Sequence, residues 1–69
     1  MSVIGVDVGG TQIKLGIVRN DLEVVYRDQR PTPGTAQDIV KTIYDMVTAA
    51  WRMAPGAAVG ISFAGTWDN

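Results

Sequence analysis

The sequence predicts an α/β fold, in which three antiparallel strands are followed by one helix and by a fourth strand parallel to the first. Three observations support this. Short apolar runs rich in valine and isoleucine lie at both ends of the chain, apolar residues recur at helical spacing over residues 36–54, and Asn-Asp or Pro-Gly pairs separate the segments. A right-handed crossover places the last strand beside the first, which gives the strand order 3-2-1-4.

The first two strands are expected to form a hairpin. Residues 3–8 and 12–19 are short runs with many β-branched side chains, and Gly9-Gly10-Thr11 lies between them as the turn. Alternation along the second strand assigns its side chains to two faces. One face carries Ile13, Leu15 and Ile17, and the other carries Lys14, Gly16 and Val18.

A third strand is expected at residues 22–29, after the turn signal Asn20-Asp21. In this strand Leu22, Val24 and Tyr26 alternate with Glu23, Val25 and Arg27. This pattern is typical of an edge strand with one wetter face. The segment Pro31-Thr32-Pro33-Gly34 is then expected to stop the meander.

The helix is expected to span residues 36–54. Thr35 is the predicted N-cap, and Asp38 completes an approximate capping box. Pro55-Gly56 ends the helix. The apolar face predicted to pack on the sheet consists of Ile39, Val40, Ile43, Met46, Val47, Ala50 and Trp51.

The fourth strand is expected at residues 57–63. It and the first strand are apolar on both sides, whereas a single helix can cover only one face of the sheet. We therefore expect an incomplete lobe. Its bare sheet face should be buried by self-association, which predicts a homo-oligomer.

Composition excludes several functions. A chain of 69 residues is at most one small domain, and its net charge of −1 gives no reason to expect nucleic acid or an anionic membrane as a partner. The lack of cysteine and histidine excludes disulfides, the usual zinc sites and Ser-His or Cys-His nucleophile pairs. With no signal-peptide core and no run near the ~20 apolar residues that span a bilayer, we expect a cytoplasmic protein.

The segment Asp7-Val8-Gly9-Gly10-Thr11 carries the strongest functional signal. Asp7 is a carboxylate in an apolar strand, where an unpaired charge is costly to bury. Glycines let backbone N–H groups approach a ligand closely, so the segment suits a phosphate with its magnesium ion. The structural alternative is a tight Gly-Gly hairpin turn in which Asp7 is an Asx-type residue. The segment lacks the Gly-Lys-Ser/Thr of a Walker A loop and the third glycine of a dinucleotide fingerprint.

In its context this segment resembles the start of ROK-family proteins. That family comprises bacterial sugar kinases and related repressors, and it belongs to the wider actin- and hexokinase-like ATPase superfamily. The matching features are Asp-Val-Gly-Gly-Thr-Gln-Ile-Lys at residues 7–14, the expected order of elements, and Val-Gly-Ile-Ser-Phe-Ala-Gly at residues 59–65. Ala64 stands where the family usually has proline, whereas Gly65, Asp68 and Asn69 match. The resemblance implies that residues 1–69 are an incomplete ribonuclease H-like or actin-like ATPase lobe, with the second lobe absent.

The resemblance also implies that the hairpin turn is the first phosphate loop of an ATP site. Gly9, Gly10 and Thr11 would offer N–H groups to the β- and γ-phosphates, and Asp7 would hold Mg²⁺ through water. Lys14 would add positive charge, or it is an ordinary strand lysine. The implied cofactor-binding residues are Asp7, Gly9, Gly10, Thr11, Gln12 and Lys14. Gly65 would line the sugar pocket, or it only ends a strand.

The implied function of the parent protein is an ATP-dependent sugar kinase that transfers the γ-phosphoryl group to a sugar hydroxyl. The family's catalytic aspartate lies beyond the matched region, so the chain alone is expected to be inactive. Two alternatives stay open, the sugar-sensing domain of a ROK-type repressor and a non-catalytic nucleotide-binding or assembly module that docks on a partner chain. Neither the sugar nor the phosphate donor can be read from this sequence.

Overall fold

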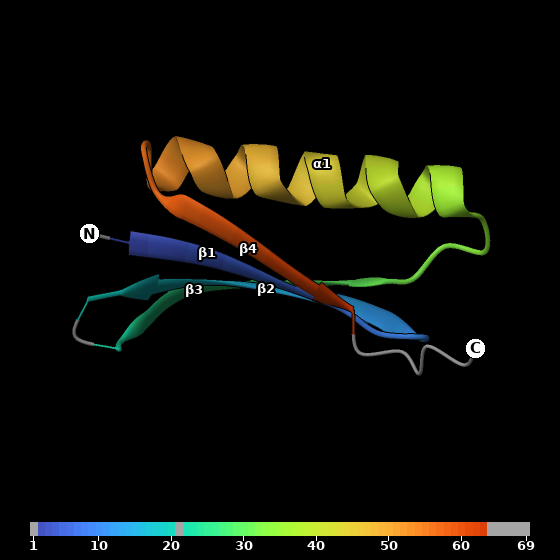
Figure 1. Ribbon diagram of the computed structural model, residues 1–69, viewed down its shortest axis with the longest axis horizontal. Helices are drawn as coiled ribbons and strands as arrows, with labels where there is room; N and C mark the ends of the chain where they lie inside the picture. The colour runs from blue at the N-terminus through green and yellow to red at the C-terminus, as the bar shows by residue number, and fades with distance from the viewer. Residues whose placement is uncertain (1, 21, 64–69) are drawn as a thin grey trace.

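The structure is a computed structural model, and it describes residues 2–20 and 22–63. These residues form one four-stranded sheet with one helix packed on one face (Figure 1). In chain order the elements are β1 (Ser2–Val8), β2 (Gln12–Arg19), β3 (Val24–Pro31), α1 (Ala36–Met53) and β4 (Ala58–Phe63).

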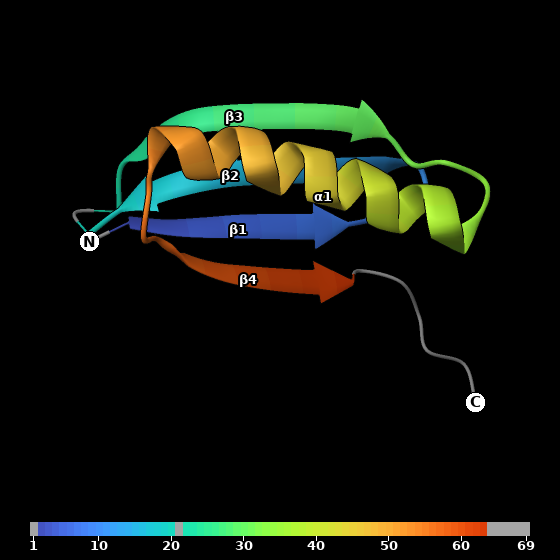
Figure 2. The ribbon, with the colours of Figure 1, turned by 90° about the horizontal axis from the view of Figure 1, so that it is seen from above.

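The sheet has the strand order β3-β2-β1-β4. The pairs β1–β2 and β2–β3 are antiparallel, and β1–β4 is parallel. Figure 2 shows α1 lying along the sheet and returning the chain from β3 to the opposite edge, where β4 points the same way as β1. The predicted α/β fold and the order 3-2-1-4 are therefore confirmed.

The core is a single layer of apolar side chains between the sheet and α1. Ile4, Ile13, Met46 and Ala50 are fully buried in it. Burying a side chain of the size of isoleucine or methionine contributes about 1.5–3 kcal/mol. The buried members of the cluster are Ile4, Val6, Val8, Ile13, Leu15, Ile17, Ile43, Met46, Ala50 and Ala57. The predicted core face of the second strand is thus confirmed.

Both ends of α1 are capped through hydrogen bonds. The Thr35 hydroxyl accepts from the N–H of Asp38 at 3.2 Å, as the capping pattern predicts. At the other end Ala54 is the C-cap, and its N–H donates to the carbonyl oxygens of Ala50 and Trp51. The helix therefore ends at Met53, one residue before the expected end.

The apolar side of α1 is wider than its contact with the sheet. The sequence places Val40 and Trp51 in the core, but their exposed fractions are 67% and 43%. A helix resting on one flat layer buries only the strip that faces that layer. The residues at the margins of the apolar side therefore stay exposed, and this part of the core prediction is wrong.

Strand β3 runs from Val24 to Pro31, so both of its ends lie two residues later than the predicted ones. Leu22 has a positive φ of 66°, and its N–H donates to the carbonyl oxygen of Arg19, so it belongs to the turn. A bulge opposite Ile17 and Val18 then shifts the register of β3 against β2.

Because of this bulge, Val24 and Tyr26 lie on opposite faces of the sheet. Val24 pairs with Val18 on the face opposite α1, whereas Tyr26 pairs with Ile17 and packs against the core. The predicted simple alternation through β3, with both residues on one face, is wrong.

The sheet face opposite α1, here called the open face, carries no further element within the described residues (Figure 1). Gly16, Gly5 and Gly60 are aligned in register across it, and Val3 and Val24 beside them are exposed. On the helix side, the outer strand β4 also exposes Val59, Ile61 and Phe63. For residues 2–20 and 22–63 the expected bare face is confirmed, and β4 exposes side chains on both of its faces.

Candidate functional site

The glycine turn follows the carboxyl end of β1. Because β1 and β4 are parallel, the carboxyl end of β4 lies at the same end of the sheet (Figure 2). The N–H of Gly9 donates to the carbonyl oxygen of Gln12 at 2.9 Å, which joins the two sides of the turn. Ligand sites of open α/β sheets form at the carboxyl ends of their strands. The turn is therefore at the end of the sheet where such a site is expected.

The two glycines of the turn differ in their surroundings. A Cβ at position 9 would lie 3.2 Å from the carbonyl oxygen of Gln12, which is tighter than most real contacts. A Cβ at position 10 would meet no atom within 4 Å. A side chain at position 9 would therefore force the turn to shift by a few tenths of an ångström, whereas Gly10 borders open space that a ligand can occupy.

The connection between β3 and α1 holds the turn through Thr32. The hydroxyl of Thr32 donates to the carbonyl oxygen of Gly9 at 2.8 Å, in a partly buried hydrogen bond. The N–H of Thr32 donates to the carbonyl oxygen of Thr11 at 3.0 Å. Two carbonyl groups of the turn are thus bonded to the body of the molecule.

The N–H groups at the tip of the turn have no such bond. Among the described residues, no hydrogen bond uses the N–H of Gly10 or of Thr11, and both residues are exposed. Backbone N–H groups are strong donors that need a partner, from either water or a ligand. The turn therefore presents two donors to solvent at its tip.

Asp7 lies on the open face, between Lys14 of β2 and Ser62 of β4 in the sheet register. Side chains paired in this way on neighbouring antiparallel strands have Cβ atoms about 5 Å apart. Asp7 is exposed, so the cost of burying its charge does not arise in this chain. In the part of the chain that the structure describes, no ion pair within 4 Å joins it to Lys14.

A hollow of about 290 Å³ brings the predicted residues together. It is lined by Asp7, Gly9, Thr11, Gln12 and Lys14. Five of the six predicted cofactor-binding residues thus share one hollow. The sixth, Gly10, lies beside them at the tip of the turn. Gly65, Asp68 and Asn69 lie outside the described residues, so the predicted sugar contact of Gly65 stays a prediction.

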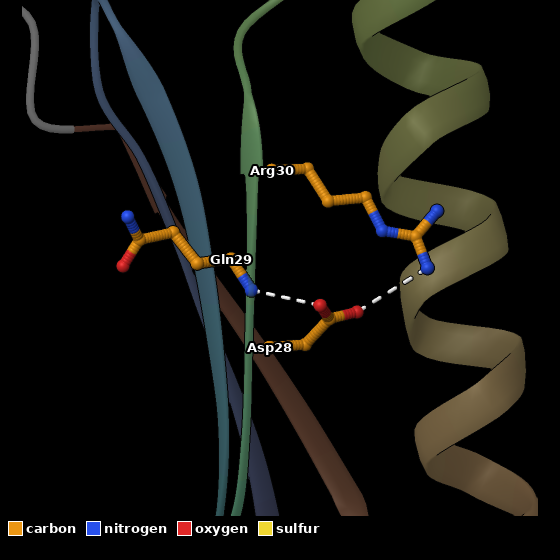
Figure 3. A network of polar contacts seen from close by, with 3 residues as sticks. All are labelled: Asp28, Gln29 and Arg30. Atoms are coloured by element: carbon orange, nitrogen blue, oxygen red, sulfur yellow. Dashed lines mark hydrogen bonds and ion pairs between the residues drawn. The ribbon is translucent and has the colours of Figure 1, made fainter.

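Strand β3 supports one wall of this hollow. The side-chain amide of Gln29 donates to that of Gln12. Figure 3 shows Gln29 on one side of β3, while Asp28 and Arg30 point to the side of α1. The Asp28 carboxylate accepts the N–H of Gln29 at 2.8 Å and lies 3.3 Å from the Arg30 guanidinium. Of these contacts, the Gln29–Gln12 hydrogen bond is the one that involves a residue of the hollow.

Among the described residues, Asp7 is the single carboxylate that lines the hollow. Within residues 2–20 and 22–63, no group of three or more acidic side chains is arranged to hold a metal ion. This donor set fits a magnesium ion that keeps much of its water and takes further ligands from a phosphate, as Mg²⁺ usually does.

The described residues also contain no helix that could span a membrane.

Sequence reasoning missed Thr32, Gln29 and the contacts that they make. Thr32 is 23 residues from Gly9, and Gln29 is 17 residues from Gln12. A local pattern cannot predict such contacts. The available signal was the placement of Thr32 between Pro31 and Pro33, which restricts its backbone.

A β-meander with a glycine turn after its first strand, followed by a crossover helix and a parallel fourth strand, defines the start of an actin-like ATPase lobe. The model of the ROK family matches residues 3–69. The chain belongs to the ROK family.

Individual relatives agree with this assignment. The chain is 40% identical over 62 residues to a glucokinase of Streptomyces coelicolor, covering 90% of this chain and 20% of that protein. It is also 40% identical over 47 residues to the N-acetyl-D-glucosamine kinase of Haemophilus influenzae, covering 67% of this chain and 16% of that protein. The chain thus spans a fifth or less of the length of these curated relatives.

One solved structure shows the same fold. The crystal structure of a ROK family glucokinase from Streptomyces griseus in complex with glucose and AMPPNP matches with a TM-score of 0.84 at 38% identity. The match covers 94% of this chain and 21% of that chain. The sheet and helix therefore correspond to about a fifth of the S. griseus glucokinase chain.

Proposed function

We propose that this chain is the N-terminal part of the ATP-binding lobe of a sugar kinase, which transfers the γ-phosphoryl group of ATP to a sugar hydroxyl. The observation that carries the proposal is the hollow at the end of β1, lined by Asp7, Gly9, Thr11, Gln12 and Lys14. The similarity to two sugar kinases supports the class of reaction. The S. griseus structure contains glucose and AMPPNP, which supports a sugar and a nucleoside triphosphate as substrates.

The residues of the hollow have distinct roles in this proposal. The N–H groups of Gly10 and Thr11, with the Thr11 hydroxyl, bind oxygens of the β- and γ-phosphates. Asp7 holds hydrated Mg²⁺, and Lys14 adds positive charge near the phosphates. The bound ion neutralises phosphate charge, which is the main electrostatic requirement of phosphoryl transfer.

The described residues supply only part of the machinery that this proposal requires. Phosphoryl transfer requires a positioned nucleophile and charge stabilisation on all sides of the transferred group. In the part of the chain that the structure describes, the hollow supplies one turn and one carboxylate. We therefore expect no sugar phosphorylation by the 69-residue chain and assign the catalytic base to a second lobe.

We further propose that the isolated chain self-associates through its open face. Val3 and Val24 are exposed there, beside a row of glycines that leaves a hollow of about 560 Å³. Exposed apolar surface of this kind favours association in water.

The second candidate function is an assembly module that docks on a partner chain. It is favoured by β4, whose residues Val59, Ile61 and Phe63 are exposed on the helix side. In this alternative the hollow beside the glycine turn has no catalytic use.

A chimaera tests the kinase proposal. Residues 3–63 of this chain replace the matching segment of the S. coelicolor glucokinase, and ATP-dependent glucose phosphorylation is measured. The kinase proposal predicts activity within about tenfold of the parent glucokinase, a difference of about 1.4 kcal/mol in barrier height. A chimaera that folds, as judged by circular dichroism and thermal unfolding, but shows no activity would contradict the proposal. That outcome would favour the assembly module.

A further inference from the structure

We propose that Thr32 is a positioning residue for the glycine turn and that its hydroxyl sets the direction of the Gly10 N–H toward a phosphate oxygen. This inference rests on the proposed function. Thr32 does not line the hollow and acts through the turn, because its hydroxyl donates to the carbonyl oxygen of Gly9 at 2.8 Å.

The planarity of the peptide bond links the two groups. The carbonyl of Gly9 and the N–H of Gly10 belong to the same peptide unit, and in a trans peptide they point in opposite directions. No peptide bond in the described residues is cis. A hydrogen bond that fixes the Gly9 carbonyl toward Thr32 therefore fixes the Gly10 N–H away from Thr32 and toward the exposed side of the turn.

The hydroxyl of Thr32 also replaces the bond that closes an ordinary hairpin turn. In a β-turn over residues 9–12, the carbonyl of Gly9 would accept from the N–H of Gln12. In the described part of the chain that bond is absent, and the hydroxyl of Thr32 is the donor to Gly9. Without it, the Gly9 carbonyl can turn toward Gln12 and rotate the Gly10 N–H with it.

The backbone of Thr32 is well suited to this task. Pro31 has a fixed φ, and a residue that precedes a proline, as Thr32 precedes Pro33, is restricted to extended conformations. The second bond, from the N–H of Thr32 to the carbonyl oxygen of Thr11 at 3.0 Å, fixes the residue further. The hydroxyl is thus held in place before any ligand binds, and little conformational entropy is lost when it bonds to Gly9.

The test compares three variants in the chimaera described above. Thr32→Val removes the hydroxyl but keeps the β-branched shape, and Thr32→Ser keeps the hydroxyl. Thr35→Val is the matched control, because it also removes a threonine hydroxyl that forms one hydrogen bond, with the N–H of Asp38. For each variant KM for ATP, KM for glucose and kcat are measured, together with the melting temperature.

We expect Thr32→Val to raise KM for ATP about tenfold, the effect of losing one well-formed hydrogen bond, while KM for glucose changes less than about twofold. Thr32→Ser should restore KM for ATP to within about twofold of the unmodified chimaera. Thr35→Val should lower the melting temperature without raising KM for ATP. If Thr32→Val changes KM for ATP no more than Thr35→Val does, the inference is wrong.

A second measurement separates this inference from the proposed function. In the ¹⁵N-labelled 69-residue chain, the amide resonance of Gly10 should move in Thr32→Val and stay in place in Thr35→Val. An unmoved Gly10 resonance would overturn the positioning contact even if the chimaera is an active kinase. An inactive unmodified chimaera would contradict the proposed function, and the nucleotide role of Thr32 would fall with it.

Discussion

Asp7 and Lys14 are directly opposed residues of the antiparallel strands β1 and β2, on the sheet face that α1 leaves open. Both are exposed, and both line the hollow beside the glycine turn. A carboxylate suits hydrated Mg²⁺, and an ammonium group suits phosphate oxygens. This pair of opposite charges lies next to the N–H groups of Gly10 and Thr11, which form no hydrogen bond among the described residues. Together these groups make the hollow on which the kinase proposal rests.

The two glycines of the turn should respond differently to alanine. Gly9→Ala places a Cβ 3.2 Å from the carbonyl oxygen of Gln12, so we expect it to destabilise the hairpin by about 1 kcal/mol or more. Gly10→Ala meets no protein atom within 4 Å and should leave stability unchanged within about 0.5 kcal/mol.

The same Gly10→Ala change should weaken nucleotide binding, because the added methyl group occupies the space proposed for phosphate. In the chimaera we expect KM for ATP to rise about tenfold or more at an unchanged melting temperature. A Gly10→Ala variant with normal KM for ATP would show that phosphate does not approach this residue.

Stability of the isolated chain should depend on Met46. Its side chain is fully buried between α1 and the sheet, so Met46→Ala should cost about 2–5 kcal/mol in urea unfolding. The core of a chain this small rarely supplies more than about 3–5 kcal/mol in total, so the unfolding midpoint of the variant should fall close to zero urea. Met53→Ala is the control, because that side chain is 62% exposed and its loss should change stability by less than about 0.5 kcal/mol. Equal unfolding midpoints for the two variants would contradict the described core.

Self-association should depend on the open face. Val24 lies on that face and is 40% exposed, so Val24→Lys should shift the chain toward the monomer in sedimentation velocity runs over a concentration series. Val40→Lys is the matched control on α1, where Val40 is also exposed. If both variants sediment like the unmodified chain, the open face is not the contact surface.

Local signals in the sequence were sufficient for most of the fold. Alternation identified the buried face of β2, and the pattern Thr35 to Asp38 identified the start of α1, because both depend on residues close in the chain. The bulge opposite Ile17 and Val18 has no such signal, and it moved Val24 to the open face. The exposure of Val40 depends on how much sheet lies under α1, which periodicity does not report.

The site was predictable to a similar degree. Asp7 and the glycine turn are contiguous in the chain, and their placement in one hollow with Lys14 follows from the hairpin register. The hydrogen bond of Thr32 joins residues on two elements that meet only after the helix connection has formed. Contacts of this kind require the folded structure.

The measurement that tests the central claim most directly is the rate of ATP-dependent glucose phosphorylation by the Asp7→Asn chimaera. Asparagine keeps the shape of the side chain and removes the charge proposed to hold Mg²⁺. We expect kcat/KM for ATP to fall by about 10²-fold or more, at an unchanged melting temperature. Asp45→Asn, which removes an exposed carboxylate from α1, should leave the rate within about twofold. If Asp7→Asn retains the rate of the Asp45→Asn control, Asp7 is not part of a phosphate and magnesium site.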